Sequence, residues 1–256
     1  MANQIPTSSI LGINVARLTV DQFIDCVLAA ARERRRWRVC YVNAANFNLA
    51  ATERRYAEVL RSADLVYADG QAVVWASRYL GCPLPERVNA GDFFERFCKA
   101  CARANLTLCF IGSGPGIAQR AAQNLMERVA GLRIVAAREG YFEPTMTGTI
   151  VGEINQLAPD FLVVGMGAPR QELWVADNIH RLDVGVAWSV GALFEYFSGY
   201  RARAPVWMRR AGLEWLFRLA LEPRRLCKRY LVGNWVFAWR VMRERWSRSG
   251  ADRRGR

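Results

Sequence analysis

Among the residues that could do chemistry, one carboxylate stands apart. Asp69 lies in the segment LVYADGQAVV, residues 65–74, after an apolar run and before Gly70, and no lysine or arginine occurs within four residues of it. Short acids of this kind often close a turn by bonding to nearby backbone. A carboxylate is equally suited to take a proton from a reacting hydroxyl as a general base. The residue types alone leave both interpretations open.

A glycine-rich segment is the second candidate. The run CFIGSGPGIAQRAA, residues 109–122, places Gly112, Gly114 and Gly116 between a predicted strand and a predicted helix. Glycines at this point let the backbone approach a phosphate at the helix N-terminus. Ile117 stands where the full dinucleotide fingerprint has its third glycine. The spacing favours contact with a nucleotide or a sugar phosphate, and it leaves open a plain turn or a nicotinamide cofactor.

Two amide side chains follow other predicted strands. Asn43 lies in YVNAANFN, and Gln171 lies in GMGAPRQELW, where Pro169 precedes a helical pattern. From the first turn of a helix, Gln171 would point into a cleft beside the strand ends. The competing interpretation is that Asn43 satisfies local backbone and that Gln171 is an ordinary first-turn residue.

Other chemistries have weaker support. The seven cysteines have no disulfide-framework spacing, which favours a reducing compartment. Cys98 and Cys101 fall in the middle of a helical pattern, so we expect buried packing residues rather than a redox pair. Cys82 and Cys109 have no partners at metal-ligand spacing. His180 is the single histidine, so we expect any general base to be a carboxylate.

The order of the elements predicts an α/β fold, a Rossmann-like parallel sheet with helices on both faces. Short apolar runs alternate with helical patterns of 10–18 residues, which is typical of parallel sheets. Asn43, Asp69, the 112–116 loop and the 167–172 segment all follow predicted strands, so we expect one cleft at the carboxyl edge. Helices are predicted at 18–35 (with a capping box from Thr19 to Gln22), 51–63, 90–105, 114–131, 147–159 and 169–182. Strands are predicted within 37–50 (ending in an asparagine-rich turn), 64–70, 106–112, 132–139, 160–167 and 184–191.

The basic charge is concentrated at the C-terminal end. Residues 200–256 hold 16 lysines and arginines against 4 acids, and five of the nine tryptophans. A catalytic domain over 1–199 followed by a helical appendage over 200–256 accounts for this division. Such a tail suits an anionic partner, and indoles settle at lipid headgroup depth, so we expect association with an anionic membrane surface. A packed helix with a solvated basic face is the alternative, and nucleic acid is disfavoured because no recognised module is present.

The motifs also resemble a known family. Over about residues 10–237 the chain resembles the WecG/TagA/CpsF glycosyltransferases (glycosyltransferase family 26), and the motifs occur in the same order. They are Asn43, ADG at 68–70, RV at 87–88 followed by Asp92, FIGSGPG at 110–116, GYF at 140–142, GAPRQE at 167–172, GALFEYFSG at 191–199, RAP at 203–205 and GLEWLFRLALEPRR at 212–225.

The resemblance implies an activity and a location. It implies an inverting, metal-independent transfer of a sugar from a UDP-sugar to a polyprenyl-diphosphate-linked sugar in bacterial surface polysaccharide or teichoic acid synthesis. No cofactor is implied, and the enzyme would lie peripherally on the cytoplasmic face of the inner membrane. A non-catalytic nucleotide-binding peripheral membrane protein and a nicotinamide enzyme are the competing hypotheses. Self-association through the tryptophan-rich tail is left open.

The resemblance also assigns roles to residues. Asp69 would be the base, assisted by Asn43 and Gln171. Arg218 and Arg225, seven residues apart, are expected on one face of one helix, where their charge would stabilise the leaving group. The residues assigned to substrate binding are Tyr41, Arg87, Gly112, Gly114, Gly116, Tyr141, Arg218, Arg225 and Lys228.

Three positions depart from the family pattern. Tyr41 replaces the usual threonine two residues before Asn43, which bears on the shape of the sugar pocket. Lys228 replaces an arginine, so bidentate contact with phosphate is lost there, although Arg229 is adjacent. Glu195 replaces the usual aspartate in GALFEYF.

Overall fold

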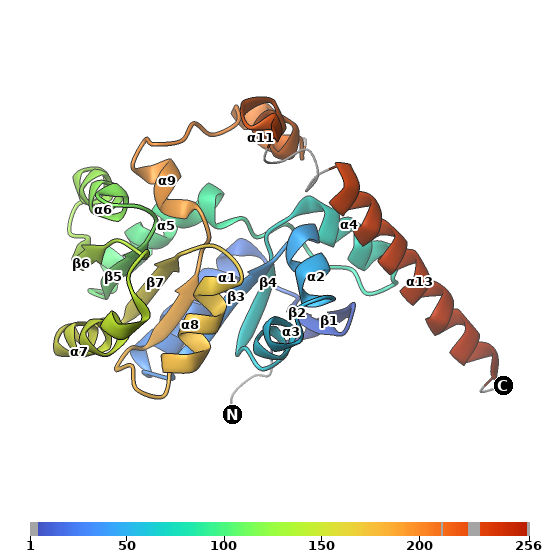
Figure 1. Ribbon diagram of the computed structural model, residues 1–256, viewed down its shortest axis with the longest axis horizontal. Helices are drawn as coiled ribbons and strands as arrows, with labels where there is room; N and C mark the ends of the chain where they lie inside the picture. The colour runs from blue at the N-terminus through green and yellow to red at the C-terminus, as the bar shows by residue number, and fades with distance from the viewer. Residues whose placement is uncertain (1–4, 211, 225–230, 255–256) are drawn as a thin grey trace.

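Six parallel strands form the central sheet of the molecule. The computed structural model describes residues 5–210, 212–224 and 231–254, and the strand order is β4-β3-β8-β7-β5-β6 (Figure 1). Every neighbouring pair is parallel, which confirms the predicted sheet. The strands are β3 Trp37–Val42, β4 Leu65–Ala68, β5 Thr107–Gly112, β6 Arg133–Arg138, β7 Phe161–Gly165 and β8 Val186–Ser189.

Helices cover both faces of this sheet, as expected. Buried residues of one face pack with α1 Val20–Arg32, α5 Ala90–Arg103, α6 Ile117–Arg128 and α9 Leu193–Phe197. Buried residues of the other face pack with α2 Ala44–Ala50, α3 Arg54–Arg61, α4 Gln71–Tyr79, α7 Thr147–Leu157 and α8 Arg170–Asn178. A short 3₁₀ turn, η1 Pro144–Met146, precedes α7.

The core on the first face is built around one indole. Trp188 of β8 is fully buried, and the rings of Phe23, Phe94 and Phe97 lie with their centroids 5.3, 5.7 and 5.0 Å from its ring. Its Nε1–H donates a hydrogen bond of 3.0 Å to the hydroxyl of Tyr67 on β4. A buried indole N–H needs such a partner. Because β3 lies between β8 and β4, this bond spans the strand that precedes Asn43.

Two helices begin with the same side-chain device. The predicted capping box of α1 is confirmed, with Thr19 and Gln22 each accepting from the other's backbone N–H. Asn43 and Asn46 repeat the arrangement at α2, so the expected asparagine-rich turn is a helix instead. Asparagine favours turns, but here the paired cap of Asn43 and Asn46 satisfies the first N–H groups of a helix, and the helix forms.

An N-terminal hairpin and helix α4 were not predicted. Strands β1 Thr7–Ile10 and β2 Ile13–Ala16 pair antiparallel, and the turn residues Leu11 and Gly12 both have left-handed φ values of 47° and 73°. Two successive left-handed residues are the signature of a type I′ hairpin turn. The signal available in the sequence was the alternation of isoleucine and valine around Gly12.

The C-terminal elements form a helical extension that folds back on the body. After α9 come α10 Val206–Arg210, α11 Glu214–Leu221 and α13 Gly233–Arg254. Helix α13 packs against α2 and α4 (Figure 1). It buries Phe237 and Val241, and the ring of Phe237 lies 5.6 Å from that of Phe47. The carbonyl of Gly233 accepts a bond of 2.6 Å from Asn48. In the described part of the chain, no helix combines the length and apolar character needed to cross a membrane.

The expectation that Arg218 and Arg225 share a face of one helix stays a prediction, because Arg225 lies outside the described residues. Helix α11 ends at Leu221, two residues before Pro223, and residues 225–230 lie outside the described residues. Proline disfavours the helical conformation in the residue before it and cannot donate to the helix. Helix α11, which carries Arg218, therefore stops before this proline.

The docking of α13 can be tested by comparing a residue on its docked face with one on its exposed face. Replacing Phe237 with alanine should weaken the docking by about 3 kcal/mol, because a buried phenylalanine is lost. Amide exchange within α13 should then accelerate on the order of 100-fold. Trp235→Ala is the matched control, since Trp235 is 77 % exposed on the same helix and its loss should cost under about 0.5 kcal/mol. Equal acceleration in both variants would contradict the docked arrangement.

Candidate active site

Two of the residues predicted to share a cleft, Asp69 and Asn43, lie next to one another at the carboxyl edge of the sheet. The backbone N–H of Asp69 donates to the carbonyl of Val42 at 3.0 Å, so the residue after β4 lies beside the end of β3. A Cβ atom added to Gly70 would lie only 3.0 Å from Cβ of Asn43. Glycine therefore permits this close approach, and it brings Asp69 and Asn43 next to one another.

The half-buried Asp69 borders the aromatic core. The pKa of Tyr67 is raised well above its usual value, first by burial and then by the negative charge of Asp69. Tyr67 also accepts the hydrogen bond from Trp188 described above. The carboxylate thus stands at the boundary between the cleft and a low-dielectric interior, where charge interactions are strong.

Asn43 serves both the fold and the cleft. Its Oδ1 accepts from the backbone N–H groups of Ala45 and Asn46 at 3.0 and 3.2 Å. Asn46 in turn donates to the hydroxyl of Tyr56 at 2.7 Å. The local-backbone interpretation of Asn43 is therefore correct for its oxygen. Its Nδ2 is a hydrogen-bond donor at the sheet edge, beside the Asp69–Gly70 segment.

Gln171 is placed differently from the expectation. It is fully buried, and its Oε1 accepts from the backbone N–H groups of Gly167 and Gly191 at 3.2 and 3.0 Å. Its Nε2 donates to Glu172 at 2.7 Å. The side chain does not extend into the cleft; it ties the loop after β7 to the loop after β8. In this arrangement Gln171 fixes the two loops relative to one another.

Tyr41 lies on the same wall. A Cβ added to Gly191 would come within 2.6 Å of the Tyr41 hydroxyl, and the Tyr41 ring lies 6.3 Å from that of Tyr67. The tyrosine that departs from the family pattern therefore packs between the strand that precedes Asp69 and the loop after β8. Its bulk therefore fills space at this edge of the sheet.

Glu172 was missed at the sequence level. Its side chain is 1 % exposed, and burial raises its pKa to about 7. Its Oε1 accepts from Gln171, and its Oε2 has no hydrogen-bond partner among the described residues. Glutamate in a first helical turn is usually solvated. The burial of Glu172 follows from the packing of α8 against β3 and β8, which the sequence alone does not reveal.

The three glycines of the loop differ in their surroundings. Gly112 is closely packed, whereas Gly114 and Gly116 have open space beside them. A Cβ on Gly112 would clash with the carbonyl group of Gly165, so this glycine is required by the close approach of β5 and β7. Gly116 adopts φ +75° at the start of α6, where a Cβ would meet nothing within 4 Å, and a Cβ on Gly114 would meet only Ile117 at 3.8 Å. The last two glycines therefore leave backbone accessible at a helix N-terminus, as phosphate binding requires.

Tyr141 lies next to this loop. The backbone N–H of Gly140 donates to the carbonyl of Ser113 at 3.0 Å, which draws the segment after β6 against the glycine loop. Tyr141 is 58 % exposed, and the guanidinium of Arg170 lies 5.3 Å from its ring centroid. An exposed ring beside a guanidinium at the sheet edge can contact a ligand, whereas a core tyrosine cannot.

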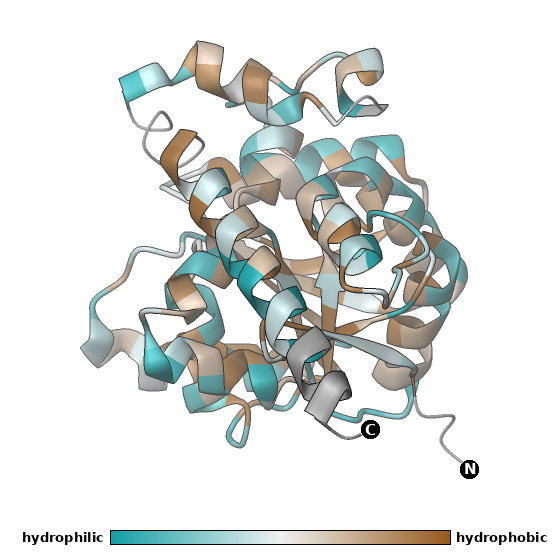
Figure 2. Cartoon of the chain, turned by 90° about the vertical axis from the view of Figure 1, so that its right-hand side faces the viewer, coloured by the Kyte–Doolittle hydropathy of each residue, from teal (hydrophilic) through white to brown (hydrophobic). Residues whose placement is uncertain are grey.

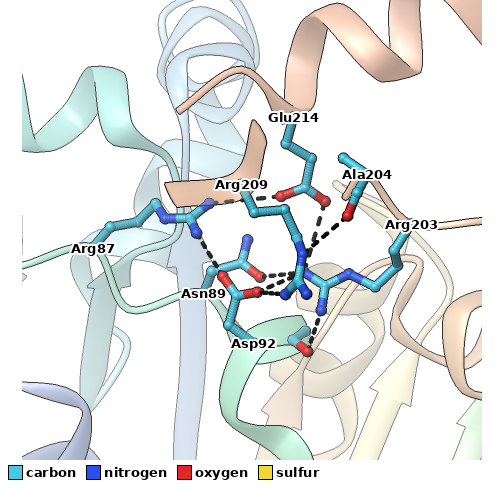
Figure 3. Close-up of polar contacts among 8 residues, drawn as sticks. Arg87, Asn89, Asp92, Arg203, Ala204, Arg209 and Glu214 are labelled. Carbon is cyan, nitrogen blue, oxygen red and sulfur yellow. Dashed lines mark hydrogen bonds and ion pairs between the residues drawn. The ribbon is translucent and has the colours of Figure 1, made fainter. Parts of the chain in front are cut away.

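Arg87 belongs to an ion-pair cluster, not to an isolated cation site. It donates to Asp92 at 2.5 Å and lies 3.6 Å from Glu214 of α11 (Figure 3). Arg203 pairs with Asp92 at 3.0 Å, and Arg209 also donates to Asp92. Three guanidinium groups thus surround one carboxylate. The cluster joins the start of α5 to α10 and α11, which the sequence spacing did not predict.

The same cluster borders Asp69. The backbone N–H of Val88 donates to the carbonyl of Ala68 at 2.9 Å, which holds Arg87 near the end of β4. A Cβ on Gly212, in the turn between α10 and α11, would lie 3.3 Å from Gln71, two residues after Asp69. The appendage therefore reaches the sheet edge that carries Asp69. Arg218 belongs to α11, while Arg225 and Lys228 lie outside the described residues.

Comparison with known proteins identifies the class. Residues 8–251 match the Glycosyl transferase WecG/TagA/CpsF family, so the chain belongs to this family of glycosyltransferases. It is 27 % identical over 219 residues to proteins of Staphylococcus aureus strains NCTC 8325 / PS 47 and COL, with 85 % of each chain covered. Both are named N-acetylglucosaminyldiphosphoundecaprenol N-acetyl-beta-D-mannosaminyltransferase. The family resemblance inferred from the motifs is confirmed.

Metal chemistry remains a separate question. In residues 5–210, 212–224 and 231–254, no three histidine, cysteine or acidic side chains group in a way that could hold a metal ion. Cys98 and Cys101 are fully buried on α5, as expected for packing residues. Transfer without metal or cofactor stays a prediction from the resemblance.

The burial of Glu172 predicts a pH dependence of stability. Below pH 4.5 this carboxyl is protonated in both states, and as the pH rises toward 7 the unfolded chain ionises first. The free energy of unfolding should therefore fall by about 3 kcal/mol across this window. Glu172→Gln keeps an acceptor for Gln171 and should remove that fall in denaturant titrations at several pH values. Glu127→Gln on the exposed face of α6 is the control, and an unchanged slope in Glu172→Gln would contradict the assignment.

Proposed function

We propose that the protein transfers a sugar from a UDP-sugar to a polyprenyl-diphosphate-linked sugar acceptor, with inversion at the anomeric carbon. The observation that carries the proposal is the juxtaposition of Asp69, Asn43 and the α10–α11 turn at one sheet edge. The Staphylococcus aureus relatives, named for transfer to a diphosphoundecaprenol-linked sugar, support the acceptor class.

Asp69 is the proposed base. The acceptor hydroxyl gives its proton to this carboxylate as its oxygen bonds to the anomeric carbon, and the bond from that carbon to the UDP oxygen breaks. Attack opposite the leaving group inverts the configuration. A positioned general base contributes roughly 10²–10⁴-fold in rate. Asn43 would hold the substrate through its amide, and Gln171 would act through the loops that it joins.

The leaving group needs positive charge and N–H donors. Gly114 and Gly116 offer backbone at the start of α6 to the diphosphate. Cationic side chains would supply the charge. They are Arg87 from the body, Arg218 from α11, and Arg225 and Lys228, which lie outside the described residues. Fixed cations of this kind stabilise developing negative charge without reorganisation.

The membrane-associated acceptor requires the enzyme to meet a lipid surface. Exposed apolar side chains gather on the C-terminal extension, which also carries most of the excess positive charge. Indoles and arginines together are typical of interfacial helices. We infer peripheral attachment at the cytoplasmic face through this extension. The exposed set is Tyr200, Val206, Trp207, Leu216, Leu221, Leu231, Val232, Trp235, Trp239, Met242 and Trp246.

The role of Asp69 predicts a loss of turnover without a loss of fold. Asp69→Asn keeps the shape of the side chain but cannot take the proton, so kcat should fall roughly 10²–10⁴-fold. UDP release from a UDP-sugar in the presence of a lipid-diphosphate-linked sugar measures it. Asp25→Asn, on the exposed face of α1, is the control. Normal turnover in Asp69→Asn would contradict the assignment of Asp69 as the base. No turnover in the unaltered protein with any UDP-sugar tried would favour a non-catalytic nucleotide-binding role.

The attachment predicts that exposed indoles contribute to vesicle binding. Replacing Trp235 and Trp246 with alanine should lower binding to phosphatidylcholine vesicles on the order of tenfold or more, since apolar surface is no longer buried in the interface. Met126→Ala with Leu157→Ala is the matched control, because both residues are exposed on helices of the opposite end of the sheet. Equal losses in the two double variants, measured by flotation, would argue against the extension as the membrane contact.

A further inference from the structure

A groove lies between α13 and the body, away from the strand ends. It measures about 430 Å³ and is bounded by the β1–β2 turn, by α2 and by one side of α13. Figure 2 looks toward the side of the molecule on which α13 lies over the body. The apolar residues that line the groove are Leu11, Ile13, Phe47, Ala50, Ala51 and Trp239. Nothing in the proposed transfer reaction uses this groove.

Three arginines line the groove. Arg61 comes from α3, and Arg240 and Arg243 come from α13. Among the described residues, no carboxylate lies within ion-pair distance of any of the three, although many other arginines of the chain are paired. Nε of Arg240 is buried and has no hydrogen-bond partner among the described residues. A buried guanidinium N–H without a partner is costly, so this group favours an acceptor from outside the chain.

The acid in the groove wall is already engaged. Glu244 accepts from the backbone N–H of Leu11 at 2.8 Å and from Arg248 at 2.6 Å. Its charge is therefore balanced by Arg248 and by the hairpin turn. The groove consequently presents an excess of positive charge over an apolar floor, which is the pattern that complements an anionic amphiphile.

One edge of the groove continues into exposed indoles. Trp235, Trp239, Met242 and Trp246 follow a spacing of four, three and four residues, so they share one face of α13. Their exposed fractions run from 37 % to 77 %. Trp239 also lines the groove, and the guanidinium of Arg243 lies 5.6 Å from its ring centroid. The cationic groove thus opens beside the surface expected to meet lipid.

We propose that this groove binds the phosphate of an anionic phospholipid headgroup, with Arg61, Arg240 and Arg243 as its ligands. The proposal rests on the membrane attachment proposed above and adds a defined headgroup site to it. Phosphate is the oxyanion that guanidinium forks match geometrically. A lipid is favoured over free phosphate because the floor is apolar and the rim carries indoles. Binding there would hold α13 against the leaflet in one orientation.

Vesicle flotation of the full chain tests the site. The groove variant replaces Arg61, Arg240 and Arg243 with glutamine, and the control replaces Arg103, Arg128 and Arg133, three exposed arginines near the opposite edge of the sheet. Both lose the same charge. On phosphatidylcholine vesicles that contain phosphatidylglycerol, the groove variant should bind on the order of 100-fold more weakly, from about fivefold per arginine. The control should change by less than about threefold, since its arginines lie on α5, α6 and β6, away from α13, and solution ions screen distant charges.

Three further experiments distinguish binding of a lipid headgroup from diffuse charge attraction and from binding of free phosphate. Replacing the same three residues with lysine restores point charges without the guanidinium fork, so it should recover only part of the binding. On vesicles of phosphatidylcholine alone, the groove variant should bind as the unaltered protein does. Inorganic phosphate should not displace the protein from anionic vesicles at the concentration at which soluble phosphatidylglycerol does.

The outcomes are distinguishable. Equal losses in the groove and control variants would overturn the site in favour of diffuse charge, and displacement by inorganic phosphate would overturn the lipid assignment. Failure of the unaltered protein to bind either vesicle would instead refute the membrane attachment on which the site rests. Transfer activity on a water-soluble acceptor should be the same in all variants, because none of the replaced arginines borders Asp69.

Discussion

The parallel pairing of six strands is the constraint on which the rest of the molecule depends. Because every strand points the same way, each strand's following turn comes to one edge, and side chains far apart in the chain become neighbours. Asp69 meets Asn43 through a backbone bond to β3, and the glycine loop meets β7 through the Gly112–Gly165 contact. Antiparallel pairing would have divided these turns between two edges.

Two attachments then bring the C-terminal extension to this edge. The carboxylate of Asp92 gathers Arg87, Arg203 and Arg209, so the charge cluster fixes α10 and α11 near the start of α4 and α5 (Figure 3). The second attachment is apolar, through Phe237 and Val241 of α13. The ion pairs orient α10 and α11 on the body, and the apolar contact buries one face of α13. The indoles of α13 are then left on its outer face.

The cleft walls depend on buried polar groups. Gln171 joins two loops through its oxygen and directs its amide N–H toward Glu172, and this orientation uses both ends of the amide. Glu172 is kept from solvent, so its protonation is coupled to folding. Burying the Glu172 carboxyl to bond Gln171 costs desolvation free energy. Ionisable groups shifted by burial in this way are common at functional sites. The proposed base itself lies closer to solvent.

The sequence by itself determined the alternation of strands and helices, the carboxyl-edge placement of Asp69, Asn43 and the glycine loop, and the family. These follow from local periodicity and from ordered motifs, which are properties of short segments. Tertiary structure alone decided that Gln171 bonds to loops instead of facing the cleft, that Glu172 is buried, and that Arg87 pairs with Glu214. It also decided that α13 carries apolar residues on two opposite faces, one docked and one exposed. Each of these depends on contacts between residues distant in the chain, and such contacts form only once the elements pack.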